Sequence, residues 1–173
     1  MLPTLLLLCA GLALTHAAAV PEAEPDQMME EASVQDDGEV FSGGCPSGWS
    51  NYRDRCFLSI STAQTWALAE RNCRAQGGNL ASVHSYAEES FVKGLIQRTM
   101  NGSPRTWIGA SDAQQDGIWL WSDSSHFAFT NWCAGEPNGG GREHCIEMNF
   151  GSGMCWNDLS CSYHRPYVCV RSR

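Results

Sequence analysis

Cysteine is the residue that most constrains how this chain can fold. Of the nine cysteines, Cys9 lies in an apolar N-terminal run and the other eight lie between residues 45 and 169. These eight are Cys45, Cys56, Cys73, Cys133, Cys145, Cys155, Cys161 and Cys169. An even number of cysteines in a secreted chain predicts four disulfides and no free thiol. Zinc coordination is the alternative, and the absence of paired Cys-x-x-Cys motifs disfavours it.

The N-terminus predicts secretion. The apolar run from Leu5 to Leu14 is too short to span a membrane, and it ends in the small residues of 16–19, which suit cleavage by signal peptidase. We therefore expect residues 1–19 to be a signal peptide. No later segment is apolar for long enough to form a membrane span, so the mature protein is expected to be soluble and extracellular.

Residues 20–44 are predicted to be a disordered acidic arm or a propeptide, because they carry too few apolar side chains to form a core. Eight of the 19 acidic residues lie there, which leaves eleven against the eleven Lys and Arg of residues 45–173. They are Glu22, Glu24, Asp26, Glu30, Glu31, Asp36, Asp37 and Glu39. The remaining chain is near neutral, which argues against nucleic acid as a partner.

Residues 45–173 predict one α+β domain. Short strands are expected at 45–49 and 52–57, then a helix from Ser61 or Thr62 to the Gly77-Gly78 pair, which suits a helix end. Ser85 and Glu88 form a capping-box pattern ahead of a second helix. Further strands are predicted at 79–83, 107–110, 118–121, 145–150, 154–158 and 167–170. Residues 123–144 are irregular, and the cysteines at their ends indicate an ordered loop of functional importance.

A group of oxygen donors predicts a calcium site in and after this loop. Five side chains within 23 residues supply three carboxylates and two amides: Glu136, Asn138, Glu143, Asn157 and Asp158. Ca²⁺ takes about 6–8 oxygen ligands, so positions would remain for the vicinal hydroxyls of a sugar. The alternative is that the segments Glu136-Pro137-Asn138 and Asn157-Asp158 only form turns in a polar loop.

Taken together, the landmarks of residues 45–171 resemble a C-type lectin-like domain. The set comprises Cys45-Pro46-x-Gly48-Trp49, Cys73-Arg74-x-x-Gly77-Gly78-x-Leu80-Ala81, Trp107-Ile108-Gly109, Asp116-Gly117-x-Trp119-x-Trp121-Ser122-Asp123, Glu136-Pro137-Asn138, Trp156-Asn157-Asp158 and Tyr167-x-Cys169. The resemblance implies two helices flanking two small antiparallel sheets, with a long calcium-binding loop. It also implies the pairs Cys45–Cys56, Cys73–Cys169 and Cys145–Cys161, which leaves Cys133–Cys155. That fourth pair resembles a subset of fish lectins that includes the type II antifreeze proteins.

The resemblance also implies roles for the loop residues. Glu136, Asn138, Glu143, Asn157 and Asp158 match the ligands of one calcium ion and the hydrogen-bonding groups around a bound sugar. Pro137 is expected to follow a cis peptide. The acid-then-amide order of Glu136 and Asn138 is associated with mannose-type sugars, whereas the reverse Gln-Pro-Asp order is associated with galactose.

A second calcium site of the family is matched only in part. Asp112 and Asp116 occupy its first two ligand positions, and Glu143 could be shared. Gly139 and His144 stand where further oxygen donors are expected. We therefore expect this second site to be lost or weak.

The sequence thus predicts a secreted, calcium-dependent lectin of mannose-type specificity, with a role in innate recognition of microbial glycans. It is predicted not to be an enzyme, because its histidines show no spacing to a nucleophile. Its expected partners are glycans with vicinal equatorial hydroxyls, and a homo-oligomer would raise avidity. Two alternatives stay open: an ice-binding protein of the type II antifreeze kind, and a calcium-independent protein-interaction module.

Overall fold

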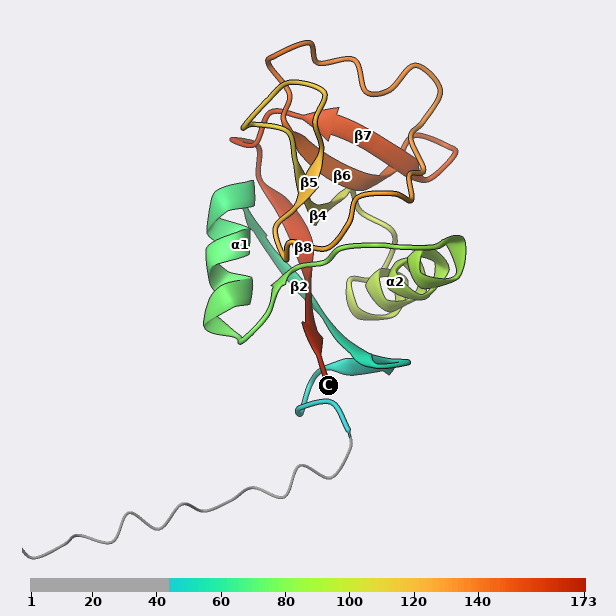
Figure 1. Cartoon of the computed structure of the whole chain (residues 1–173). Coiled ribbons are helices and arrows are strands. Elements are labelled where there is room, and N and C mark those ends of the chain that lie inside the picture. The colour runs from blue at the N-terminus through green and yellow to red at the C-terminus, as the bar shows by residue number, and fades with distance from the viewer. Residues whose placement is uncertain (1–43) are drawn as a thin grey trace, which may run out of the picture. The chain divides into compact units, whose positions relative to one another are not determined.

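The computed structural model describes residues 44–173 (Figure 1). The predicted signal peptide, Cys9 and all but the last residue of the predicted acidic arm lie outside the described residues. Within residues 44–173, neither helix has the length and apolar character needed to cross a membrane. The elements are β1 (Ser50–Tyr52), β2 (Arg55–Gln64), α1 (Trp66–Ala75), β3 (Asn79–Leu80), α2 (Tyr86–Thr99), β4 (Thr106–Ser111), β5 (Leu120–Trp121), β6 (Cys145–Phe150), β7 (Cys155–Leu159) and β8 (Arg165–Ser172).

The first helix begins later than predicted, whereas its end and the second helix agree with the sequence. Strand β2 continues to Gln64, which pairs with Arg165 of β8, so the prediction of a helix start at Ser61 or Thr62 is wrong. Beyond α1, Gly77 has φ +78°, the left-handed conformation expected where a helix ends. Helix α2 begins as predicted, with Ser85 Oγ accepting from the backbone N–H of Glu88 at 3.2 Å.

The strands form one mixed sheet in the order β1-β2-β8-β4-β6-β7, with β3 beside β8 and β5 beside β4. Every pairing is antiparallel except that of β4 with β8, where Trp107 pairs with Tyr167. The two small antiparallel sheets that were predicted are therefore joined at this short parallel contact. Helices α1 and α2 lie on either side of β2 and β8, and the loop between β5 and β6 lies at the end away from the C-terminus (Figure 1).

All eight cysteines beyond residue 44 are paired in the four predicted disulfides. The bonds are Cys45–Cys56, Cys73–Cys169, Cys133–Cys155 and Cys145–Cys161. The zinc alternative is excluded for these residues, because no thiolate remains among them to bind a metal. Cys133–Cys155 joins the long loop to the start of β7, and it closes a segment of 22 residues.

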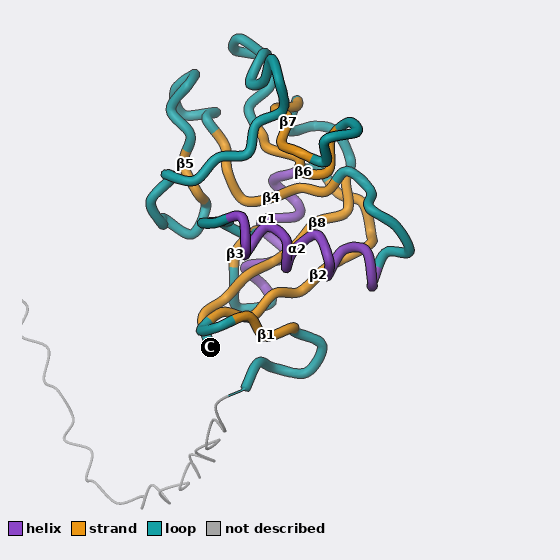
Figure 2. The backbone as a smooth tube through the Cα atoms, turned by 90° about the vertical axis from the view of Figure 1, so that its right-hand side faces the viewer, coloured by secondary structure: helices purple, strands orange, loops and turns teal. Residues whose placement is uncertain are grey.

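The long loop is held to the core by backbone pairing as well as by this disulfide. Trp156 accepts from the N–H of Cys133 at 2.9 Å and donates its own N–H to the carbonyl of Asn131 at 2.8 Å. The side chains of Phe127, Phe129 and Trp132 pack against the Trp156 ring, which is fully buried. The aromatic side chains of the loop therefore pack against the main hydrophobic core, in agreement with the prediction that the loop is ordered. Figure 2 shows it as a long teal path beside β5, β6 and β7.

Helix α2 supports the same loop through the buried carboxylate of Glu89. Its Oε1 accepts from Asn131 Nδ2 at 2.9 Å and from Trp156 Nε1 at 3.1 Å. Lys93 Nζ lies 3.0 Å from the same oxygen. One carboxylate thus connects the helix, the loop and β7.

We expect Glu89→Ala to lower the free energy of unfolding by about 2–4 kcal/mol, because it leaves a buried indole N–H and an amide unpaired and removes a paired charge. Urea denaturation with all disulfides intact measures the change. The matched control is Ser90→Ala at the next, exposed position, which should change stability by less than about 0.5 kcal/mol. Equal effects of the two substitutions would contradict this role of Glu89.

Candidate functional site

Asp158, on β7, fixes the tip of the long loop. It is only 2% exposed, and its two carboxylate oxygens accept different backbone N–H groups. Oδ1 accepts from Asn138 at 3.0 Å and Oδ2 accepts from Gly139 at 2.8 Å. The chain directly after Pro137 is therefore attached to the end of the sheet.

Glu136 precedes this attachment point and has an oxygen with no partner. The Glu136–Pro137 peptide is cis, as predicted. Glu136 Oε1 accepts from Asn138 Nδ2 at 3.0 Å, whereas Oε2 is buried and has no hydrogen-bond partner among the described residues. A carboxylate oxygen in this situation suits a cation, because burial without a partner is costly.

Glu143 completes a group of three carboxylates. It lies just before β6, and a methyl group built at Gly139 would approach Glu143 Cβ to 2.3 Å and Asp158 Oδ2 to 2.8 Å. Gly139 is thus packed between the two acids. Burial is the main cause that raises the pKa of Glu136 to about 7, and the neighbouring carboxylates of Asp158 and Glu143 add to the shift. Burial, followed by repulsion from Asp158 and Glu147, raises the pKa of Glu143.

Asn157 lies next to Asp158 on β7. Its side chain is held by Glu147, a residue that the sequence analysis did not identify. Asn157 Nδ2 donates to Glu147 Oε1 at 3.1 Å, and Glu147 lies directly opposite on β6. The signal that marks Glu147 in the sequence is an acid inside the apolar run 145–150. The structure thus brings together Glu136, Asn138, Glu143 and Asp158, and places Asn157 beside them on β7.

The chemistry of the predicted donor set, with a buried Glu136 oxygen that has no hydrogen-bond partner, is compatible with a hard cation, although within residues 44–173 the ligand atoms that converge to within 4.8 Å are those of Asp112, Asp116 and His144. Carboxylates gathered in a partly buried site raise one another's pKa values. The buried Glu136 oxygen that has no hydrogen-bond partner adds to this uncompensated negative charge. A divalent ion would neutralise the carboxylates, and Ca²⁺ prefers this kind of oxygen set.

The second, partial site has a histidine among its carboxylates. Asp112 Oδ1 lies 2.8 Å from His144 Nδ1, and Asp112 Oδ2 accepts from the N–H of Gly117 at 2.8 Å. The hydrogen bond with Asp112 is the main cause that raises the pKa of His144. Asp112, Asp116 and His144 offer ligand atoms within 4.8 Å of one another. An imidazole is a poor ligand for Ca²⁺, and Gly139 supplies no side-chain oxygen.

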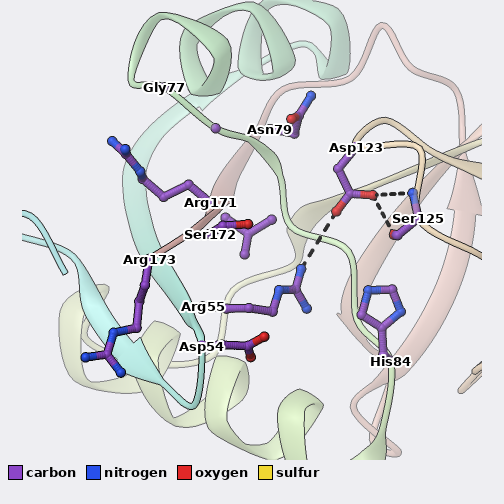
Figure 3. Close-up of a pocket in the computed structure, with 12 residues that line it drawn as sticks. Asp54, Arg55, Gly77, Asn79, His84, Asp123, Ser125, Arg171, Ser172 and Arg173 are labelled. Carbon is purple, nitrogen blue, oxygen red and sulfur yellow. Dashed lines mark hydrogen bonds and ion pairs between the residues drawn. The ribbon is translucent and has the colours of Figure 1, made fainter. Parts of the chain in front are cut away.

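A hollow of about 650 Å³ lies elsewhere, beside the C-terminal end of β8 (Figure 3). His84 and Asp123 line it, and both contact the hydroxyl of Ser82. The Ser82 hydroxyl is fully buried, accepts from Arg55 Nη2 at 2.6 Å and donates to Asp123. His84 Nε2 lies 3.1 Å from it. The Ser82 hydroxyl is thus held inside a network of ion pairs that Arg55 makes with Glu88 and Asp123.

The tryptophans considered as sugar-stacking platforms are mostly core residues. Trp107, Trp121 and Trp156 are buried at 0%, 3% and 0% exposure. Trp119 is partly buried, packs against Trp132, and lines a small hollow with Asp112, Asp116 and Pro137. Of the four, Trp119 alone adjoins the candidate site.

The model of the lectin C-type domain family matches residues 62–171 of this chain. The chain belongs to the C-type lectin family. Ladderlectin of Oncorhynchus mykiss is 41% identical over 96% of this chain and 90% of its own length. The galactose-specific lectin nattectin of Thalassophryne nattereri is 39% identical over 76% of this chain and 82% of its own. Among solved structures, the herring type II antifreeze protein has a TM-score of 0.71 and 38% identity, covering 75% of this chain and 99% of that one.

We expect the metal-free protein to lose stability as pH rises through about 7. The pKa of Glu136 is raised from 4.5 to about 7 in the folded state, so its proton stabilises the fold below pH 4.5 and this contribution is gone above pH 7. Urea midpoints measured in EDTA from pH 5 to 8 test this. Glu136→Gln should flatten the profile, whereas Asp54→Asn, at an exposed carboxylate in the β1–β2 turn, should not. A profile unchanged by Glu136→Gln would contradict the prediction.

Proposed function

We propose that this protein binds carbohydrate through a calcium ion held by Glu136, Asn138, Glu143, Asn157 and Asp158. The observation that carries the proposal is the cluster of three carboxylates with an unpartnered buried oxygen on Glu136, in a chain of the C-type lectin family. Calcium bound there would supply open coordination positions for two vicinal hydroxyls of a sugar. The carboxylates would accept hydrogen bonds from those hydroxyls, and the amides of Asn138 and Asn157 would donate to them.

We further propose mannose-type specificity, from the order of the acid and the amide around Pro137. A sugar whose hydroxyls do not match this order would leave polar groups of the site unpaired, at a cost of roughly 1–3 kcal/mol each. Nattectin, a relative of this chain, is a galactose-specific lectin, so mannose and galactose are the two sugars to compare.

We propose secretion and a role in recognising microbial glycans, with no catalytic step. Four disulfides suit an oxidising compartment, and residues 1–19 retain the features of a signal peptide. A single site of this kind binds a monosaccharide weakly, so glycan surfaces would be recognised by several domains together.

Chromatography on immobilised sugars tests the proposal. The full-length secreted protein should be retained by mannose in the presence of calcium, be released by EDTA, and pass through a galactose column. The sugars are coupled to a carbohydrate-free polymer, because agarose is itself a galactose polymer. Calcium-independent retention, or no retention by either sugar, would overturn the mechanism, whereas retention by galactose alone would overturn only the sugar class.

A pair of substitutions in the loop provides the matched variant. Glu136→Gln with Asn138→Asp reverses the order of acid and amide, and it should move retention from mannose to galactose while EDTA still releases the protein. Asp54→Asn serves as the control and should behave as the wild type. A double variant that still prefers mannose would show that the acid-amide order does not set specificity here.

Ice binding is the second candidate function, because of the similarity to the herring antifreeze protein. If the lectin proposal is right, thermal hysteresis of the purified protein should not exceed that of an unrelated protein at equal concentration. Hysteresis that is present with calcium and abolished by Asn157→Ala would replace the lectin proposal with an ice-binding one.

A further inference from the structure

Glu147 is a fully buried carboxylate at the centre of β6, and both of its oxygens are occupied. Arg165 Nε lies 2.6 Å from Oε2. Asn157 Nδ2 lies 3.1 Å from Oε1, and Arg105 Nη1 lies 3.5 Å from the same oxygen. Taking a charge out of water is costly even when it is paired.

This contact decides which way the Asn157 side-chain amide points. An ionised carboxylate only accepts hydrogen bonds, whereas a side-chain amide has an NH₂ group on one side and a carbonyl oxygen on the other. Because the NH₂ group faces Glu147, the carbonyl oxygen Oδ1 faces away from it. Within residues 44–173, Oδ1 of Asn157 accepts no hydrogen bond. The carbonyl oxygen is the atom that a hard cation would take.

Glu147 in turn is held in place by the two arginines. Arg165, the first residue of β8, forms an ion pair with Oε2, so Oε1 is the oxygen that accepts the hydrogen bond from Asn157. Arg105 approaches from the segment before β4. Strands β7 and β8 and the segment before β4 therefore each contribute one donor to this carboxylate, whose charge is balanced by the two arginines without using the Asn157 amide.

We propose that Glu147 is a positioning residue for the cation site. It holds the Asn157 amide in the single orientation that presents Oδ1 to calcium, and it leaves the second N–H of the amide free for a sugar hydroxyl. This inference rests on the proposed calcium-dependent function. Glu147 itself is assigned no contact with the metal or the sugar.

Glu147→Gln tests the proposal with minimal change of shape. Arg165, a charged donor, takes the one carbonyl oxygen of the new amide, so its NH₂ group faces Asn157. The Asn157 amide must then turn over and present NH₂ to the cation. We expect calcium affinity, measured by titration calorimetry on the full chain, to fall about 10–100-fold, the usual effect of losing a residue that orients a metal ligand.

Exchanging the carboxylate and the amide between positions 147 and 157 distinguishes a positioning role of Glu147 from a merely structural one. In Glu147→Gln with Asn157→Asp, one oxygen of the new carboxylate accepts from the new amide and the other faces the cation. Calcium affinity should return to within a few-fold of the wild type, while mannose retention stays weak because the amide donor at 157 is gone. Asn157→Asp alone sets two carboxylates face to face and should not bind calcium as well as the double variant.

A measurement without metal keeps this inference separable from the proposed function. In EDTA, the ¹⁵N-labelled wild type should show one slowly exchanging proton on the Asn157 amide, assigned by its loss in Asn157→Asp and absent in Glu147→Gln. A wild type that binds no calcium overturns the proposed function and this inference with it. Calcium binding with equal affinity in Glu147→Gln, failure of the exchange to restore affinity, or no protected proton in the wild type overturns the inference alone.

Discussion

The position of the candidate site depends on the hydrogen bonds that the Asp158 carboxylate accepts from the loop. Its two oxygens accept the backbone N–H groups of Asn138 and Gly139, so the position of the loop tip follows from the position of β7. The same contacts bring Glu136 and Glu143 close to Asp158, and burial, followed by repulsion from Asp158, raises the pKa of both glutamates. The order of the loop and the excess of negative charge within it therefore have one origin. A loop that is fixed before ligand arrives loses little conformational entropy on binding.

The support behind the site comes from parts of the chain that are distant in sequence. Glu89 on α2 connects Asn131 and Trp156, and the disulfide Cys133–Cys155 lies next to this connection. The aromatic rings of the loop pack on the same Trp156. A segment with almost no regular secondary structure is thus attached through a carboxylate, a covalent bond and ring packing, which together restrict its movement.

Features that depend on neighbouring residues could be predicted from the sequence, whereas features that depend on long-range pairing could not. The helix cap at Ser85 and the helix end at Gly77 are local, and both are present, although the Glu88 side chain accepts from the N–H of His84 and not from that of Ser85. Four disulfides and a calcium site were predicted from residue types and spacing alone, whereas the pairing of the cysteines and the roles of the loop residues were implied by the family resemblance. The extension of β2 to Gln64 depends on Arg165, about a hundred residues away, and nothing near Ser61 indicates it.

The packing around Gly139 limits how this site can change over evolutionary time. A β-carbon there would overlap Glu143 and Asp158, so the family's missing ligand cannot be regained by one substitution at this position. In the neighbouring partial site, His144 is bonded to Asp112, and neither His144 nor Gly139 supplies a side-chain oxygen. A side-chain ligand at position 139 would require the backbone between Asn138 and Glu143 to move first, and that backbone is attached to Asp158. A change at this position is therefore also a change in how the tip of the loop is fixed.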